Sequence, residues 1–406
     1  MQQAVMTKKP NRTLLVVASG SMEASITGRN ALGRHRIQLE TGEFSRLEYL
    51  FFRTEVSQEH HLDESFRVVD VSGREPSGPL AHSRWIRRIA LWRSGVREID
   101  EQASRIAPDV VAALDPFIAG WIAYRQARRL TRPFLITLVS NYRLSWEVAG
   151  MNPIPFLPPS ISFVIERYIL GRADRIHVDC QHYGEYAISR GVSPERIRVI
   201  PRYADPVFYD GRVESDILAR LGINDSRPCV YVGRLSPEKY SLELLESFRR
   251  VHQERPHAQL VIVGGGGVLE NEFLDQSIRL GLRQAIHLIR GLEAQEIRSL
   301  LASAGVVFAT HAGYALLEAA LAEAPVVAYN FEWQPEVITT GETGLLVPYR
   351  DAEAMADAAL ELLNDPTLAK QMGRSLGEKA RREYSVQRTR DALGQSYRQL
   401  LGRTPT

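Results

Sequence analysis

The sequence of 406 residues contains only two cysteines, Cys180 and Cys229, which lie far apart along the chain. Their separation matches no usual spacing of metal ligands, and so low a cysteine count fits a reducing compartment. We therefore expect both side chains to be free thiols. A strong charge imbalance is also absent, since the formal net charge is +2. The net charge thus neither supports nor excludes a polyanionic partner. We expect no nucleic-acid partner.

Long apolar runs are absent as well. The first apolar stretch, residues 13–18, is far too short for a signal peptide or a membrane-spanning helix. No later run approaches the length needed to cross a bilayer, and the sequence has no internal repeat. These absences predict a soluble, cytoplasmic protein.

One segment leaves contact with a membrane surface open. Residues 82–105 predict a helix in which Trp85 and Trp92 are flanked by arginines such as Arg93. Tryptophans beside arginines are typical of a helix that lies on an anionic lipid surface. An ordinary amphipathic helix that packs on a sheet shows the same pattern and is the more frequent case. Peripheral attachment to the inner face of the cell membrane through residues 85–93 therefore stands as the alternative to a core helix.

The composition is that of a globular protein, with 44% hydrophobic and 24% charged residues. The length indicates two domains. Short apolar strands alternate with helical segments in both halves, which predicts an α/β fold with parallel sheets. We place the N-terminal domain at residues 1–210 and the C-terminal domain at residues 211–385. A last helix, residues 386–406, is positioned to return to the N-terminal domain.

In the N-terminal half, two loops follow predicted strands. Gly20 lies in the loop after the first strand, and Ser140 and Asn141 follow the strand at residues 133–138. Such loops line the ligand crevice of a doubly wound fold, so we expect them at the binding edge. No GxGxxG follows a strand, which makes a nicotinamide-dependent dehydrogenase a poor hypothesis.

In the C-terminal half, the strand at residues 228–232 leads into a polar turn that contains Gly233, Arg234 and Lys239. Two fixed cations can neutralise a diphosphate without a metal ion. A surface loop with a local Arg–Glu–Lys network would show the same sequence, so both interpretations stay open at this point.

A glycine run follows the next strand. Residues 264–267 are four glycines, of which Gly264 and Gly265 come first after the strand at residues 259–263. Glycines allow a backbone to approach a ligand closely. A flexible turn would have the same composition.

The stretch at residues 306–318, VVFATHAGYALLE, predicts a strand, a small-residue turn and a helix. Backbone N–H groups at the start of such a helix suit a phosphate. His311 lies in the turn, Gly313 ends it, and Glu318 lies about one helical turn further on, where its carboxylate could accept bonds from sugar hydroxyls. One more βα unit with a surface glutamate is the alternative.

Taken together, these motifs resemble the family-4 retaining glycosyltransferases of GT-B architecture, in the glycogen synthase and glycosyl transferase group 1 superfamily. The matching pieces are VGRLSPEK at residues 232–239, VGGG at 263–266, GYALLEA at 313–319, APVVA at 324–328, PEVI at 335–338 and GETGLLVP at 341–348. Residues 173–205 match more loosely.

The resemblance implies two Rossmann-like, doubly wound domains that face each other across a cleft. The acceptor would bind the N-terminal domain and a nucleoside diphosphate sugar of the UDP or GDP type the C-terminal one. The implied reaction, in polysaccharide biosynthesis or a related process, moves a hexosyl group to a hydroxyl of a glycan, a lipid-linked saccharide or a small molecule. Retention would proceed on the front face, with no metal or other cofactor.

The resemblance also implies roles for individual residues. Arg234 and Lys239 would act in catalysis, because they would hold the donor diphosphate and stabilise it as it leaves. Glu318 would bind the ribose hydroxyls, and Arg290, within residues 288–291, would flank the base. The other residues implied on the donor side are Gly20, Gly233, Gly264, Gly265, Thr310, His311, Gly313, Tyr314, Ala315 and Leu316. Ser140 and Asn141 would lie on the acceptor side.

Two departures from the family pattern stand out. The family has a glutamate eight positions before Glu318, where this chain has Thr310 beside His311. Many members also have a histidine after the strand at residues 133–138, where this chain has Val139, Ser140 and Asn141. A degenerate member that binds a nucleotide sugar without transferring it is therefore the alternative hypothesis.

Overall fold

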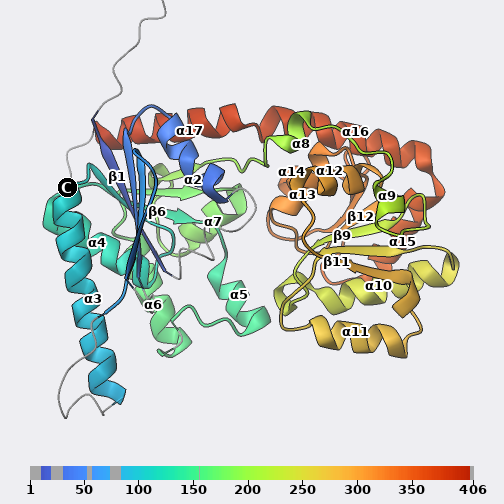
Figure 1. The fold of residues 1–406 in the computed structure, drawn as a ribbon, viewed down its shortest axis with the longest axis horizontal. Helices are drawn as coiled ribbons and strands as arrows, with labels where there is room; N and C mark the ends of the chain where they lie inside the picture. The colour runs from blue at the N-terminus through green and yellow to red at the C-terminus, as the bar shows by residue number, and fades with distance from the viewer. Residues whose placement is uncertain (1–10, 20–30, 53–56, 74–83, 155, 403–406) are drawn as a thin grey trace, which may run out of the picture. The chain divides into compact units, whose positions relative to one another are not determined.

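The computed structural model describes residues 11–19, 31–52, 57–73, 84–154 and 156–402 (Figure 1). The chain divides into two compact units. The first contains Met1–Trp146, Met151–Ile200 and Thr389–Thr406, and the second contains Glu147–Gly150 and Pro201–Arg388. The chain thus crosses into the second unit at residues 200/201 and leaves it at residues 388/389, ten residues before and three residues after the expected boundaries.

The first unit is built on an eight-stranded sheet with the order β3-β4-β2-β1-β5-β6-β7-β8. Strand order runs outward in both directions from β1, which is the doubly wound arrangement that the alternation of strands and helices predicted. Its strands are β1 (Thr13–Ser19), β2 (Arg46–Phe52), β3 (Gln58–Asp63), β4 (Phe66–Val71), β5 (Val110–Ala113), β6 (Phe134–Leu138), β7 (Arg175–Val178) and β8 (Ile197–Val199).

One edge of this sheet differs from the expected parallel arrangement. β3 pairs antiparallel with β4, with an irregularity in register between His61 and Asp63. Antiparallel neighbours need only a tight turn, so an edge hairpin can be added without a crossover helix. β3 alternates weakly and is largely exposed, which explains why the apolar pattern did not predict it.

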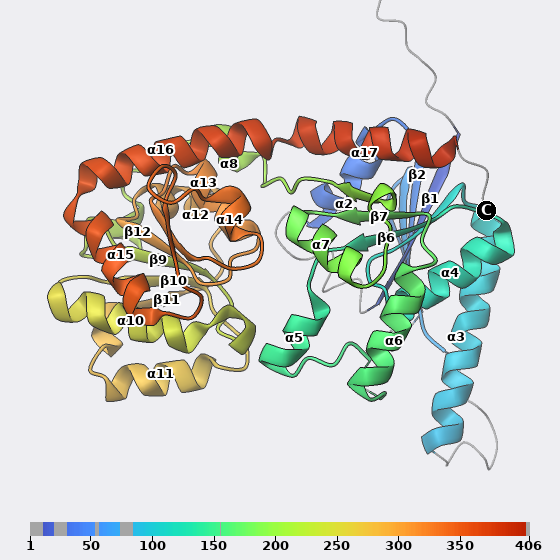
Figure 2. The same cartoon turned by 180° about the vertical axis from the view of Figure 1, so that it is seen from behind.

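The helices of the first unit include one from the far end of the sequence. In both views, the C-terminal helix lies beside α2 (Figures 1 and 2). The Nη2 atom of Arg390 donates to a carboxylate oxygen of Glu40 at 2.7 Å, and Tyr397 donates to Gln38. The helices are α2 (Ala31–Glu40), α3 (Arg84–Ile106), α4 (Ile118–Leu130), α5 (Tyr142–Ala149), α6 (Pro159–Leu170), α7 (Gln181–Ser189), the 3-10 turn η2 (Pro194–Arg196) and α17 (Val386–Leu401). Residues 147–149 of α5 and 386–388 of α17 group with the second unit.

The helix proposed for membrane contact is α3. The ring of Trp92 lies 5.0 Å from the ring of Phe52 on β2 and 5.9 Å from that of Trp121 on α4. Trp92 thus makes ring contacts within the unit, as a packed helix requires, although it is only partly buried and Trp121 is 37% exposed. The side chain of Trp85 lies outside the described residues. No helix in the described ranges is both long enough and apolar enough to span a bilayer.

The second unit is built on a six-stranded parallel sheet with the order β11-β10-β9-β12-β13-β14. The strands are β9 (Cys229–Gly233), β10 (Leu260–Gly264), β11 (Ile286–Ile289), β12 (Val306–Ala309), β13 (Val326–Tyr329) and β14 (Leu345–Val347). β14 lies within the motif at residues 341–348, where the sequence analysis placed no strand. At three residues it is too short to show a period.

Helices connect these strands and cover the sheet (Figure 2). A short helix, α8, lies just before the expected domain boundary at residues 210/211. The helices are α8 (Val207–Asp210), α9 (Ile217–Arg220), α10 (Ser241–Glu254), α11 (Glu270–Arg279), α12 (Ala294–Ala302), α13 (Tyr314–Leu321), α14 (Gln334–Val337), α15 (Ala352–Asn364) and α16 (Pro366–Glu383), with the 3-10 turns η3 (Pro237–Lys239) and η4 (Arg283–Ala285).

Both cysteines are buried free thiols, as expected. Cys229 is fully buried at the start of β9. Burial raises the pKa of its thiol far above the ordinary value, so it behaves as an inert apolar side chain.

Candidate functional site

The loops after β9, β10 and β12 leave the second sheet at one edge, because these parallel strands are neighbours. They are residues 234–240, 265–269 and 310–313. The carboxyl edge of such a sheet, where strand order reverses, is the usual ligand crevice of a doubly wound fold. Of the residues that the sequence predicted for catalysis or the donor side, the three loops contain Arg234, Lys239, Gly265, Thr310, His311 and Gly313.

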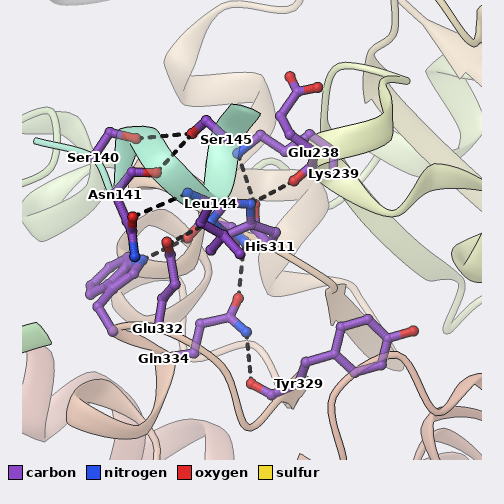
Figure 3. Close-up of polar contacts among 12 residues, drawn as sticks. Ser140, Asn141, Leu144, Ser145, Glu238, Lys239, His311, Tyr329, Glu332 and Gln334 are labelled. Atoms are coloured by element: carbon purple, nitrogen blue, oxygen red, sulfur yellow. Dashed lines mark hydrogen bonds and ion pairs between the residues drawn. The ribbon is translucent and has the colours of Figure 1, made fainter. Parts of the chain in front are cut away.

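Lys239 and the turn after β12 are joined by two reciprocal hydrogen bonds, and Figure 3 shows the one between Lys239 and His311. The Thr310 hydroxyl donates to the main-chain oxygen of Lys239 at 2.6 Å, and Nζ of Lys239 donates to the main-chain oxygen of His311 at 2.8 Å. An ammonium has three donors, so this contact leaves two for a ligand. The bonds fix the predicted cation beside the predicted phosphate turn.

The imidazole of His311 is held between two oxygens (Figure 3). Nδ1 lies 2.6 Å from the main-chain oxygen of Glu238, and Nε2 lies 2.8 Å from Oε2 of Glu332. A carbonyl oxygen can only accept, so Nδ1 carries a proton. A second proton must then lie between Nε2 and the carboxylate of Glu332, whose side chain is only 3% exposed. His311 thus braces the turn through both ring nitrogens, whereas a contact with the donor was predicted.

The remainder of the turn is held by residues at the start of α14. Ala312 donates its N–H to Oε1 of Gln334 at 3.0 Å, and Nε1 of Trp333 donates to the main-chain oxygen of Ala312 at 3.0 Å. Gln334 in turn donates to the main-chain oxygen of Tyr329 at 2.7 Å (Figure 3). These bonds position the short backbone segment before any ligand binds.

The turn leads directly into α13. Gly313 is the N-cap residue, and no described side chain caps the helix there. The backbone N–H groups of Tyr314 and Ala315 lie in the first turn, where no intrahelical acceptor exists. The side chain of Leu316 is 1% exposed and its N–H donates to the main-chain oxygen of Gly313 at 3.2 Å, whereas Glu318 lies one turn further on and is 8% exposed. The N-terminus of α13 can therefore bind an anion.

The two predicted catalytic cations differ in environment. Burial lowers the pKa of the Lys239 ammonium to about 8. Arg234 is two-thirds exposed, and its Nη2 atom lies 3.0 Å from Oε1 of Glu238. The local Arg–Glu pair of the alternative interpretation is therefore present. Its exposed guanidinium can still turn toward a ligand, because a surface ion pair contributes only about 0–1 kcal/mol.

The glycine run packs against the loop after β9. Gly264 pairs in register with Gly233, and the N–H of Gly265 donates to the main-chain oxygen of Gly233 at 3.1 Å. A Cβ on Gly264 would lie 3.2 Å from that oxygen, and its φ is +104°. These glycines let two loops approach closely, which accounts for them without a ligand.

Arg290 is bonded to the loop after β10 through Glu270. Its guanidinium forms an ion pair with Glu270, whose carboxylate also accepts the N–H of Gly266. The Arg290 bond is the main reason why the pKa of Glu270 lies below its usual range. The side chain of Leu288 faces Gly265, since a Cβ on that glycine would lie 2.7 Å from it. The segment predicted to flank the base therefore borders the glycine run.

Comparisons with known proteins agree with this geometry. Residues 214–382 match the family described as glycosyl transferases group 1, and residues 43–203 match the glycosyl transferase 4-like domain. Together the two matches cover most of both units. The chain belongs to the group 1 family of glycosyltransferases, with the GT-B fold.

Curated relatives of this family member are moderately similar to it. The alpha-D-kanosaminyltransferase of Streptomyces kanamyceticus is 27% identical over 214 residues, which are 51% of this chain and 55% of the relative. The GDP-mannose-dependent alpha-(1-6)-phosphatidylinositol monomannoside mannosyltransferase of Mycolicibacterium smegmatis is 32% identical over 166 residues, 38% of this chain and 43% of the relative. The chain thus spans about half the length of the curated relatives it matches.

Solved structures match the GT-B fold over nearly the whole chain. The sucrose-phosphate synthase of Thermosynechococcus elongatus has a TM-score of 0.77 at 19% identity, covering 96% of this chain and 99% of its own. Anabaena Alr3699/HepE, in complex with UDP and glucose, has a TM-score of 0.73 at 17% identity, covering 95% and 99%.

At the two places where this GT-B chain departs from the family pattern, the side chains make different contacts. Thr310 is fully buried, and its hydroxyl is bonded to Lys239, so it positions the loop. Asn141 caps α5, since its Oδ1 accepts the N–H of Leu144 at 3.1 Å (Figure 3). The hydroxyl of Ser140 lies 3.3 Å from that of Ser145. Gly20 lies outside the described residues.

Two residues near the site were not predicted from the sequence. Glu332 follows His311 by 21 positions, and Arg202 precedes Lys239 by 37. No local motif therefore links them to the predicted diphosphate clamp of Arg234 and Lys239. The guanidinium carbon of Arg202 lies 4.4 Å from the ring centroid of Trp333 and 5.6 Å from that of Tyr314. The only sequence signal was Arg202 itself, within the loosely matching segment 173–205. Among the described residues, no group of three or more His, Cys, Asp or Glu side chains forms a metal site.

Proposed function

We propose that this chain is a retaining, metal-independent glycosyltransferase that uses a nucleoside diphosphate sugar of the UDP or GDP type. The observation that carries the proposal is the bonded arrangement of Lys239 with the turn that starts α13. It places a buried cation and uncapped helical N–H groups together, which is the combination that a diphosphate needs. The ligands of Alr3699/HepE, UDP and glucose, support the same class of donor.

The chemistry assigned to these residues is stabilisation of the leaving group. As the bond from the anomeric carbon to the diphosphate oxygen breaks, negative charge develops on that oxygen. Lys239 and Arg234 would neutralise it, and the N–H groups at the start of α13 would donate hydrogen bonds to the phosphate oxygens. The acceptor hydroxyl would form the new bond on the same face, and its proton would pass to the departing diphosphate. Glu318 would bind the ribose hydroxyls.

The acceptor is a hydroxyl of a glycan, a lipid-linked saccharide or a small molecule, and it would bind the first unit. Asn141 caps α5, and the hydroxyl of Ser140 lies 3.3 Å from that of Ser145, so neither side chain narrows the class of acceptor.

A binding protein without transferase activity is the second candidate. It is favoured by Thr310, which puts a buried neutral side chain where the family has a carboxylate. The two candidates differ in turnover. The protein should be incubated with UDP- and GDP-sugars, and the release of free nucleoside diphosphate measured with and without hydroxyl acceptors.

Release from one donor, accelerated by an acceptor and lost in Lys239→Ala, is the expected result. Tight binding of UDP or GDP with no turnover of any donor would favour the binding protein. Failure to bind either nucleotide would refute both.

A further inference from the structure

We propose that Arg202 is a third cation of this anion site and binds the terminal phosphate of the nucleoside diphosphate. The inference rests on the proposed function. It concerns a residue that lies in the segment joining the two units, outside the motifs at residues 232–348.

The segment that carries Arg202 is anchored to the second unit. The N–H of Val207 donates to Oδ1 of Asp205 at 3.0 Å, and the N–H of Ala204 donates to the Tyr209 hydroxyl at 3.3 Å. That hydroxyl donates in turn to the main-chain oxygen of Tyr384. The backbone beside Arg202 therefore has a defined place on this unit.

The guanidinium is oriented by two aromatic rings. It lies over Trp333 at 4.4 Å and near Tyr314 at 5.6 Å. Trp333 is itself held by its bond to Ala312, and Tyr314 is the first residue of α13. Stacking uses the face of a guanidinium and leaves its N–H donors at the edge. Since it has five such donors, it can bind a phosphate and keep contacts within the protein.

Electrostatics connect Arg202 with Lys239. Burial is the main reason for the low pKa of Lys239, and the positive charges of Arg234 and Arg202 lower it further. The carboxylates of Glu238 and Glu332 act in the opposite direction. The guanidinium of Arg202, which is only 7% exposed, therefore repels the ammonium. A bound diphosphate would relieve that repulsion, because its charge attracts both cations.

A purely structural role for Arg202, packing on Trp333, makes a different prediction. Packing would affect all ligands of the site equally, whereas a phosphate contact distinguishes ligands by their terminal phosphate. Affinities of UDP, GDP, UMP and pyrophosphate should therefore be measured by calorimetry for the wild type, Arg202→Gln and Arg202→Lys. Arg250→Gln is the matched control, since Arg250 pairs with Asp357 on the surface of the same unit.

Arg202→Gln should weaken UDP and pyrophosphate by about tenfold or more and UMP by less than about threefold. Arg202→Lys should restore most of the UDP affinity, and Arg250→Gln should change none. The pH above which UDP affinity declines should also move upward in Arg202→Gln, because one repulsion on Lys239 is gone.

Equal losses for UDP and UMP, or a UDP affinity within about twofold of the wild type, would overturn the inference. A wild type that binds pyrophosphate but neither UDP nor GDP would refute the proposed donor. The change in pyrophosphate affinity in the Arg202 variants would then still test the inference. A wild type that binds none of these would refute both proposals.

Discussion

Nζ of Lys239 lies 2.8 Å from the main-chain oxygen of His311, and the hydroxyl of Thr310 returns a bond to the main-chain oxygen of Lys239. These two bonds hold the loop after β9 and the turn after β12 together. The cation and the start of α13 therefore keep a fixed separation, on which the binding of a diphosphate depends.

Removal of the ammonium should weaken diphosphate binding. Lys239→Ala is expected to raise the Kd for UDP or GDP at least tenfold, since a charge-assisted hydrogen bond contributes ~1.5–3 kcal/mol. Calorimetric titration measures the change. Lys379→Ala is the control, because Lys379 also donates to a main-chain oxygen, that of Glu336, in the same unit. An unchanged Kd in Lys239→Ala would refute the clamp.

Diphosphate affinity should depend on pH through Lys239. The pKa of this ammonium in the folded protein is about 8, so the charged form that attracts a diphosphate prevails below that pH and is lost above it. Affinity for UDP should therefore be nearly constant from pH 7 to 7.5 and fall by roughly tenfold by pH 9.5. Lys239→Arg should abolish the decline, since a guanidinium stays charged. A flat profile in the wild type would contradict the assignment.

The His311–Glu332 pair should respond differently to two changes at Glu332. Glu332→Ala leaves Nε2 of His311 without its partner and should destabilise the second unit by ~1–3 kcal/mol. Glu332→Gln can donate its amide to a neutral imidazole, so its loss of stability should be smaller. Thermal unfolding should therefore rank the wild type first, Glu332→Gln second and Glu332→Ala third. Equal melting temperatures of the two variants would refute a stabilising bond between position 332 and His311.

The glycines of the site should differ in whether they tolerate replacement by alanine. Gly267 has a φ of +104°, and a Cβ there would lie 2.5 Å from the main-chain oxygen of Leu235. Gly267→Ala should therefore lower stability by at least ~1–3 kcal/mol. Gly313→Ala is the contrast, since its φ is −84° and no atom lies within 4 Å of the place that an alanine Cβ would take. Thermal unfolding of the two variants should rank them in this order, and equal melting temperatures would contradict the packing argument.

Trp92 offers a test between core packing and membrane contact. Because its ring packs against Phe52 and Trp121, Trp92→Ala should lower the stability of the first unit by ~2–4 kcal/mol. Binding to anionic vesicles, measured by co-sedimentation, should be the same as in the wild type. A loss of vesicle binding without a loss of stability would instead support the membrane alternative.

The sequence by itself determined the elements that local patterns encode. Apolar strands such as β10 and β12 end at glycines or small residues, and amphipathic helices follow them, so the doubly wound class could be predicted. Arg234, Lys239 and Gly313 could be predicted as candidates for the same reason, since each lies directly after a strand or before a helix. Chain order alone brings such residues to one edge of a parallel sheet.

Only the tertiary structure decided how these candidates are used. His311 was predicted to contact the donor, yet both of its ring nitrogens bind protein oxygens that lie 21 and 73 positions away. Arg202 meets Trp333 across 131 positions, and β3 joins its sheet as an antiparallel edge. The physical reason is that hydrogen bonds, ion pairs and ring contacts act between atoms a few ångströms apart, and such neighbours come from loops whose spacing along the chain carries no period.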